Sequence, residues 1–200
     1  LKLDFTDQKQ IDDLKQKPLH YENKFDIASG QYNLKVVFTS GGESFGKLEM
    51  PLVIEPYDKT FNLSGLALSK EFRAASDVSL DLDALVDDRT RLVANGFRII
   101  PYGASRFKRT DPAIFYAEIY EPGDVSAGLR IRILDRQTGD SKSDSGPMKV
   151  DLQKIEGSGA APLALRIPIA KLAAGSYVLE VQAVSTAGKV VKRTADFEIE

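Results

Sequence analysis

The sequence predicts an all-β protein built from β-sandwiches, and three observations support this fold class. Along many short segments apolar residues alternate with polar ones, which is the periodicity of a strand with one buried face. Gly, Pro and Asp residues separate these segments about every 10 residues, a spacing typical of sandwiches and barrels rather than of βαβ units. A segment near the N-terminus also recurs at the C-terminus with the same alternation.

The composition is that of an ordinary globular protein without a nucleic-acid-binding surface. Of the 200 residues, 42% are hydrophobic and 28% are charged, enough for one large core or two small ones. The 27 basic and 29 acidic side chains leave a net charge of -2. Nucleic-acid binders usually carry a basic excess, because phosphate contacts supply most of their affinity. We therefore expect no nucleic-acid partner, and we place the basic cluster 106–109 at a solvated hairpin tip.

Missing residue types exclude several kinds of site. The chain has no cysteine, which excludes disulfides, zinc–thiolate sites, iron–sulfur clusters and thiol nucleophiles. No run of about 18 apolar residues is present, so we predict no membrane-spanning helix. The chain begins at Leu1 within an apolar alternation and shows no signal peptide. We interpret it as a fragment or processed product of a longer protein.

The most informative feature is the internal repeat. Residues 25–55 align without gaps to residues 170–200, a shift of 145 positions. Most identities fall on a period of two that begins at a shared glycine, so both copies are predicted to have the same strand pattern. The identical residues are Ala28, Gly30, Tyr32, Leu34, Val36, Ser40, Lys47, Ile54 and Glu55, which match Ala173, Gly175, Tyr177, Leu179, Val181, Ser185, Lys192, Ile199 and Glu200.

Each copy of the repeat predicts a β-hairpin at the end of a sandwich. One strand starts at Tyr32 or Tyr177, a glycine-containing turn follows, and the second strand returns to Ile54 or Ile199. The Gly-x-Tyr before the first strand resembles the tyrosine corner of immunoglobulin-like (Ig-like) sandwiches, in which a tyrosine of the penultimate strand bonds to upstream backbone. The two copies therefore predict two Ig-like or fibronectin-like sandwiches in tandem.

The repeat also predicts how the chain is divided. We assign residues 1–58 to a partial Ig-like sandwich and residues 59–200 to an Ig-like sandwich. The linker lies at 55–60, where Pro56 and Asp58 disfavour regular structure. The first domain is shorter than the roughly 100 residues usual for such a sandwich. It is therefore predicted to be truncated or to borrow a strand from elsewhere.

Alternation and turn residues predict the other elements in order. Strands are expected at 61–69, 96–102, 113–121, 129–135, 148–154, 163–169, 177–183 and 190–199. Segments 8–17 and 79–92 have a helical spacing of apolar residues. We expect both short helices to pack over the ends of a sandwich.

No catalytic motif in the sequence lies in the structural context that its chemistry requires. Residues 42–46 match the G-x-S-x-G nucleophile elbow, but Ser44 falls in a predicted hairpin instead of a strand-to-helix turn. The single histidine, His20, precedes that serine, whereas the elbow's histidine partner follows it. His20 also lacks the companion His or Cys ligands of a typical zinc site. We predict no enzyme activity, no cofactor, and no catalytic or metal-binding residue.

Acidic clusters and aromatic residues raise two binding hypotheses. Calcium is conceivable at two clusters, but neither has EF-hand spacing, and solvated loop acids are the preferred interpretation. Carbohydrate binding would need exposed aromatic rings, and the chain has no tryptophan. Core packing explains the candidate rings at least as well as a sugar platform does. The acidic clusters are Asp81, Asp83, Asp87 and Asp88, and Asp135, Asp140 and Asp144, and the rings are Tyr102, Phe107, Tyr116 and Tyr120.

The order of segments resembles one family. The sequence PLVIEPYDKTFNLSGLALS at 51–69 leaves one predicted sandwich and enters the next, a strand–hairpin–strand follows at 97–120, and IPIAKLAAGSYVLEV at 167–181 leads into the last hairpin. This resembles the C-terminal tandem Ig-like region of exported bacterial, acidobacterial-type proteins related to von Willebrand factor A domains. That domain's metal motif, Asp-x-Ser-x-Ser, is not present here, so no metal-site residue carries over. The resemblance implies an exported protein, secreted, periplasmic or at the cell surface, and an accessory or adhesive tail.

These observations predict a non-catalytic structural or protein-interaction module of an exported bacterial protein. Its expected partner is another protein or an upstream domain of the same chain. The alternative hypothesis is a β-sandwich module that binds carbohydrate or a cell-envelope polymer. Because sandwiches host many functions, the fold class alone does not separate the two.

Overall fold

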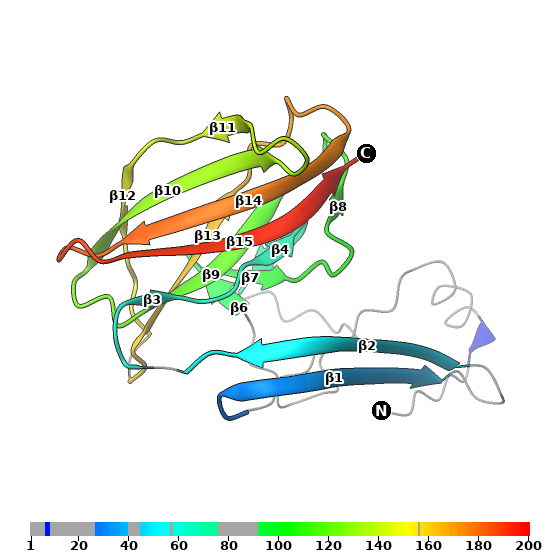
Figure 1. The fold of residues 1–200 in the computed structure, drawn as a ribbon, viewed down its shortest axis with the longest axis horizontal. Coiled ribbons are helices and arrows are strands. Elements are labelled where there is room, and N and C mark those ends of the chain that lie inside the picture. Colours follow the sequence, from blue (N-terminus) through cyan, green and yellow to red (C-terminus); the bar gives the residue numbers. More distant parts are fainter. Residues whose placement is uncertain (1–6, 9–26, 40–44, 57, 76–91, 156) are drawn as a thin grey trace.

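The computed structural model describes residues 7–8, 27–39, 45–56, 58–75, 92–155 and 157–200. In this part of the chain nearly all regular structure is β (Figure 1), which confirms the predicted all-β sandwich fold class. Two facing sheets form the body of the molecule, a small third sheet lies on one of them, and a separate hairpin precedes them in the chain. None of the described residues belongs to a helix long and apolar enough to cross a membrane.

The larger sheet has six strands in the order β11-β10-β14-β15-β8, with β12 also paired to β10. Its neighbours are antiparallel, apart from β8, which pairs parallel with β15. The inward residues of β14 are buried and its outward residues, apart from Glu180, are more exposed, as the alternation predicts. The strands are β8 (Arg106–Phe107), β10 (Ser126–Asp135), β11 (Ser141–Asp144), β12 (Met148–Asp151), β14 (Gly175–Val184) and β15 (Val190–Ile199).

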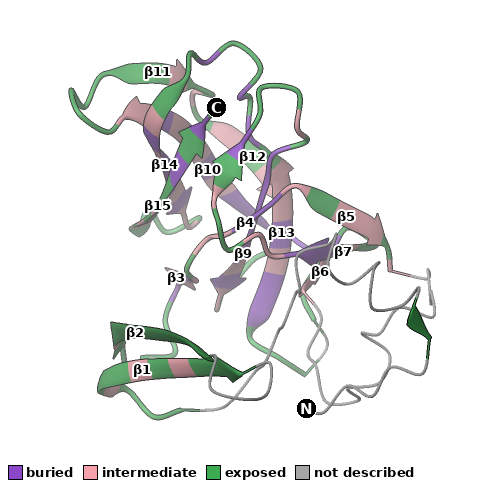
Figure 2. Ribbon diagram, turned by 90° about the vertical axis from the view of Figure 1, so that its right-hand side faces the viewer, coloured by how far each residue is buried: buried purple, intermediate pink, exposed green. Residues whose placement is uncertain are grey.

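The second sheet supplies the opposite wall of the core. Its order is β13-β9-β3, with β4 paired to the other end of β9. Side chains of the two sheets form one apolar cluster that includes Phe107, Phe115, Ile119, Leu129 and Leu179. In Figure 2 the buried residues of these strands are coloured purple. The four strands are β3 (Asn62–Leu63), β4 (Ala67–Ser69), β9 (Ile114–Tyr120) and β13 (Ala160–Arg166).

A three-stranded sheet covers the outer side of β9. It consists of β5 (Glu71–Ala74), β7 (Phe97–Ile100) and β6 (Leu92–Ala94) in that order. Ala94 and Ile99 of this sheet form a second small cluster with Ile114 and Tyr116 of β9. Both faces of β9 are therefore buried, which explains why its sequence is almost continuously apolar.

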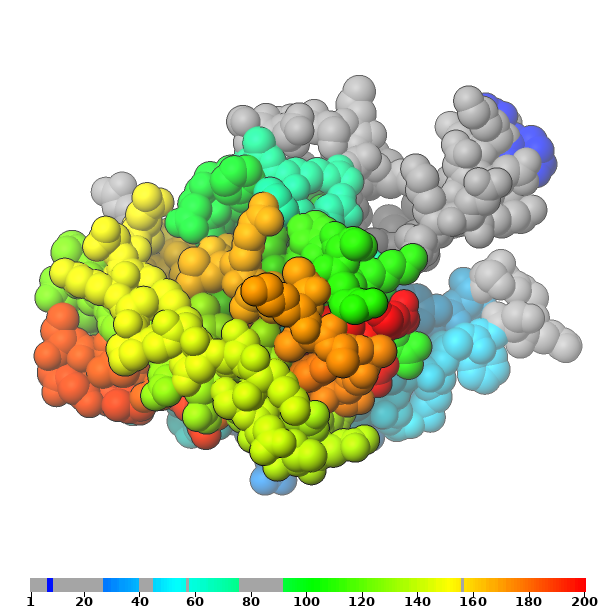
Figure 3. All heavy atoms as spheres, turned by 90° about the horizontal axis from the view of Figure 1, so that it is seen from above, coloured from blue at the N-terminus to red at the C-terminus, as the bar shows by residue number. Residues whose placement is uncertain are grey.

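The remaining strands, β1 (Gly30–Thr39) and β2 (Phe45–Ile54), form an antiparallel sheet of their own. Figure 3 shows this hairpin as light-blue spheres beside the body of the sandwich. Its strands are mostly exposed, in contrast to β14 (Figure 2). A first sandwich around β1 and β2, and the division at 58/59, remain predictions.

Several expectations need correction or fall outside the described residues. The predicted strand at 61–69 is split into β3 and β4, and β5, β6, β8 and β11 were not predicted. The basic cluster at 106–109 is not a hairpin tip, because Arg106 and Phe107 form β8 at the sheet edge and Phe107 is completely buried. Leu92 begins β6 instead of ending a helix. Residues 9–17 and 79–91 lie outside the described residues, as do Ser44, His20 and the first acidic cluster.

Candidate interaction surface

The two copies of the repeat form hairpins with the same register. In the first, Gly30 lies opposite Ile54 and Thr39 opposite Phe45. In the second, Gly175 lies opposite Ile199 and Val184 opposite Val190, so every pair is shifted by 145 positions. The sequence alignment therefore predicted which residues of one hairpin correspond to those of the other.

Both predicted tyrosine corners are present. The Tyr32 hydroxyl donates a hydrogen bond of 2.9 Å to the Ala28 carbonyl, and the Tyr177 hydroxyl donates one of 2.9 Å to the Ala173 carbonyl. The glycine two residues before each tyrosine has nearly the same φ, 158° and 157°. The two hairpins are thus equivalent down to the hydrogen bond that anchors their first strand.

The surroundings of the two hairpins differ. In β14, the side chains of Tyr177, Leu179, Val181 and Ala183 are all buried in the core. At the equivalent positions of β1, Leu34 and Val36 are half-buried, and Phe38 is 49% exposed. A face that is core in the second hairpin is thus largely uncovered in the first.

This uncovered side of β1 and β2 is called the hairpin face below. By register and alternation it carries only apolar side chains and two glycines. At two positions it is more apolar than the buried copy, because Leu48 and Met50 stand where the second hairpin has Arg193 and Ala195. Leu48 is 51% exposed. The apolar residues of the hairpin face are Tyr32, Leu34, Val36, Phe38, Leu48, Met50, Leu52 and Ile54.

The opposite side of the same hairpin is mixed. It carries the polar residues Gln31, Asn33, Lys35, Lys47 and Glu49, with an ion pair of 2.5 Å between the last two. Three exposed apolar residues, Val37, Phe45 and Val53, interrupt the polar ones. Burial of this side would remove several charges from water, so the hairpin face is the side suited to contact.

The free edge of β1 also contrasts with its counterpart. The outer edge of β14 pairs with β10 along its length, from Gly128 opposite Val184 to Asp135 opposite Tyr177. The equivalent edge of β1 has no strand partner within the described ranges. Unpaired strand edges are templates for the addition of another strand.

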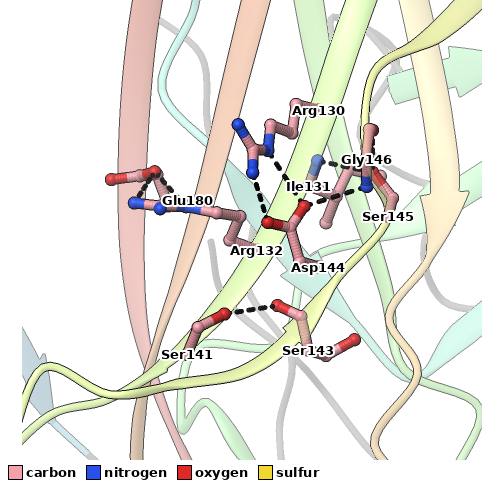
Figure 4. A network of polar contacts seen from close by, with 9 residues as sticks. All are labelled: Arg130, Ile131, Arg132, Ser141, Ser143, Asp144, Ser145, Gly146 and Glu180. Carbon is pink, nitrogen blue, oxygen red and sulfur yellow. Dashed lines mark hydrogen bonds and ion pairs between the residues drawn. The ribbon is translucent and has the colours of Figure 1, made fainter.

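The outer side of the six-stranded sheet carries a network of ion pairs (Figure 4). Arg130 holds Asp144 with Nε to Oδ1 at 2.9 Å and Nη2 to Oδ2 at 2.5 Å, and the Gly146 amide donates to the same carboxylate at 2.9 Å. The bond to Arg130, with the Gly146 amide, lowers the pKa of Asp144 to about 2. These groups are engaged with one another, which is the arrangement of a structural network rather than of an open site.

Glu180 is the buried acid of this network. Its side chain is 8% exposed and lies 2.7 Å from Arg132 Nη2 and 3.1 Å from Lys192 Nζ. Burial alone raises the pKa of Glu180, but the bonds from Lys192 and Arg132 outweigh that effect, so its pKa lies below the ordinary value. The carboxylate stays ionised and joins β10, β14 and β15.

The second acidic cluster is not arranged around one point. Asp135 Oδ1 accepts hydrogen bonds from the backbone amides of Gln137 and Thr138, which lowers its pKa, and Lys142 lies 3.6 Å from its other oxygen. Asp144 is bound to Arg130. Among the described residues no group of three or more acids, histidines or cysteines converges on a metal-sized position. An open hollow of about 470 Å³ next to Asp135 is lined by Gln137, Lys142 and residues 171–177.

The aromatic residues considered for sugar binding belong mainly to the interior. Phe107 and Tyr116 are buried, and Tyr102 packs edge-on against Phe107 with ring centroids 5.7 Å apart. Tyr116 donates a hydrogen bond of 2.7 Å to Glu118, and its burial raises its pKa. Tyr120 is half-buried. Phe107, Tyr102 and Tyr116 thus pack in the interior, which is one of the two interpretations that the sequence left open.

Arg193 joins the linker to the sandwich, and sequence analysis missed this role. Its Nε donates to the Leu63 carbonyl at 2.9 Å, and its Nη2 lies 2.8 Å from Glu55 Oε2 and 3.2 Å from Asn62 Oδ1. Nearby, Lys189 Nζ donates to the Thr60 hydroxyl at 2.6 Å. The available signal was the change from Leu48 in the first copy to arginine in the second.

Comparisons with known proteins add little to this description. No family model matches the sequence, and no curated protein matches it. Among solved structures, the chain is similar to the crystal structure of CopC from Methylosinus trichosporium OB3b. The match has 20% sequence identity, a TM-score of 0.29, and covers 50% of this chain and 85% of that chain. A likeness this weak carries no argument about function, so the relation to von Willebrand factor A-related proteins remains a prediction.

Proposed function

We propose that this chain is a non-catalytic structural or protein-interaction module of an exported bacterial protein, and that the hairpin face is where it binds. The observation that carries the proposal is a sheet face that is core in one copy of the repeat and largely uncovered in the other. A two-stranded hairpin alone is at best marginally stable in water. Contiguous exposed apolar patches with polar surroundings are typical of interaction sites.

The proposed location and neighbours rest on the segments at 51–69, 97–120 and 167–181 described above. They favour an exported protein with a von Willebrand factor A-like domain, and a partner that is another protein or an upstream domain of the same chain. The alternative, a module for carbohydrate or a cell-envelope polymer, has less support, because the candidate rings Phe107 and Tyr116 are buried.

Site-specific photo-crosslinking in the cells that produce the protein tests the proposal. A photoreactive residue is introduced at Val36, on the hairpin face, and separately at Val53, on the opposite side of the hairpin and on β2. We expect one discrete crosslinked protein product from position 36 and none from position 53. Equal products from both positions, or none from either, would contradict an interaction through the hairpin face.

A further inference from the structure

We infer that the free edge of β1 receives an extended strand from a partner protein, antiparallel to β1, with an acidic residue opposite Lys35. The inference rests on the proposed function and names the chemistry of the partner at the same surface. Addition of a strand to an exposed sheet edge is a common mode of peptide recognition, in which the backbone ladder gives affinity and alternate side chains give specificity.

The second hairpin provides the template for this strand. There β10 runs antiparallel to β14, with Leu129, Ile131 and Ile133 beside Ala183, Val181 and Leu179. Shifted by 145 positions, the same geometry places three apolar residues of an incoming strand beside Phe38, Val36 and Leu34. The partner strand therefore has apolar residues at alternate positions, and these extend the hairpin face.

Lys35 determines which charge the partner strand should carry at the position beside it. In the template, Arg132 of β10 lies opposite Glu180 of β14, with Nη2 and Oε1 2.7 Å apart. The residue equivalent to Glu180 in β1 is Lys35. Lys35 is exposed and forms no ion pair within the part of the chain that the structure describes. A strand that copies β10 would place an arginine against this lysine, so the complementary strand carries Asp or Glu there.

The size of the hairpin face argues against a second copy of this chain as the occupant. Two ten-residue strands, with a rise of about 3.4 Å and a spacing of about 4.8 Å, present roughly 350 Å² of projected area. A stable protein–protein interface buries about 800 Å² of accessible surface on each partner. The hairpin face alone is a small patch by that standard, and two hairpins packed face to face gain no backbone ladder, whereas an added strand pairs along β1.

Two synthetic peptides test the inference against the full chain. The parent peptide, SAGLRIRILD, has the sequence of residues 126–135, and the acidic peptide, SAGLRIEILD, carries Glu at the position of Arg132. Binding of the labelled peptides is measured by fluorescence anisotropy. We expect the acidic peptide to bind about 2- to 5-fold more tightly, the range of one exposed ion pair. High salt should reduce this preference, because it screens exposed charges.

Charge reversal on the protein locates the site. In Lys35→Glu the preference should reverse in favour of the parent peptide. The matched control, Lys47→Glu, changes a lysine on the same side of the hairpin but on β2, one strand further from the incoming peptide. It should leave the preference for the acidic peptide in place. Hydrogen exchange should show protection of residues 32–39 when the acidic peptide is bound.

The possible results separate this inference from the proposed function. If neither peptide binds, or if the preference is unchanged in Lys35→Glu, the inference of an added strand is wrong. If light scattering shows a dimer that Phe38→Lys dissociates, a second copy occupies the hairpin face; the inference then fails while the interaction role stands. If no peptide binds and position 36 gives no crosslink, both fail.

Discussion

At the scale of single residues, the polar groups of the six-stranded sheet are held by fixed partners. Asp144 is bound by Arg130 and by the Gly146 amide, and Glu180 lies between Arg132 and Lys192. Such pairs favour the ionised carboxylate, so they couple the stability of the sheet to pH.

The Asp144 carboxylate should titrate at about 2 in the folded protein, below its ordinary value of 3.8. Because the pKa is lowered by folding, the pair stabilises the protein fully above about 3.8, and this contribution is lost as the pH falls toward 2. Carboxyl chemical shifts followed by NMR measure the midpoint. In Arg130→Gln the midpoint should move up toward 3.8, and an unchanged midpoint would show that Arg130 is not the cause.

The two tyrosine corners offer a matched test of one hydrogen bond in two settings. Tyr177→Phe should lower the free energy of unfolding of the sandwich by about 1 kcal/mol, the net worth of a typical hydrogen bond. Tyr32→Phe removes the same bond from the exposed hairpin and should leave that unfolding transition unchanged. Urea denaturation monitors both variants. Equal losses would mean that the hairpin and the sandwich unfold as one cooperative unit.

At the scale of elements, the same strand pattern has two outcomes that depend on what surrounds it. β14 lies between β10 and β15 and faces the second sheet, while β1 has β2 on one side and, among the described residues, no strand on the other. Strand propensity alone does not distinguish β1 from β14, because apolar and polar residues alternate in the same way in both strands.

Val36 and Val181 occupy equivalent positions and test this difference. Val181→Lys places an unpaired charge in the core and should destabilise the sandwich by more than about 3 kcal/mol. Val36→Lys should change the unfolding free energy of the sandwich by less than about 0.5 kcal/mol, within the range of surface substitutions. Thermal melts followed by circular dichroism compare them. A large loss in Val36→Lys would show that the sandwich depends on the first hairpin.

Long, strongly alternating elements were predictable from the sequence, and elements defined by distant contacts were not. The second hairpin and its register with the first follow from the period of two that begins at Gly30 and Gly175. The two residues of β8 have no periodicity of their own and form a strand only because β15 lies beside them. The hairpin face could be foreseen as apolar, but its exposure depends on which strands surround it, and a local pattern does not encode that. The role of Arg193 depends on contacts across the molecule.

At the scale of the whole molecule, side chains of the last hairpin hold the linker to the sandwich, with Arg193 bound to Glu55 and Lys189 bound to Thr60. Arg193 contacts Glu55, the residue directly after β2, and Asn62 and Leu63, which form β3. Because its donors engage both a backbone carbonyl and side chains, the arginine restrains the path of the chain as well as pairing a charge.

Arg193→Leu installs the residue that the first copy has at this position, and it should loosen the hairpin relative to the sandwich. Distances between spin labels at Gln31 and Lys149 should broaden into a wider distribution. Thr194→Leu, on the opposite side of the same strand, should leave the distribution narrow. Identical distributions in all three proteins would show that Arg193 does not set the orientation.

The equal registers of the two hairpins have a consequence for folding. During synthesis β1 and β2 leave the ribosome before β14 and β15, so the earlier hairpin is available when β10 and its neighbours begin to assemble. Its strand register matches that of the hairpin between β10 and β8, and its inward residues are at least as apolar. At position 48, however, it has leucine, which cannot bond to the Leu63 carbonyl and Asn62 as Arg193 does. The hydrogen bonds of Arg193 thus favour the second hairpin over the first at the position between β10 and β8, and they disfavour a misfolded form in which the two hairpins are exchanged.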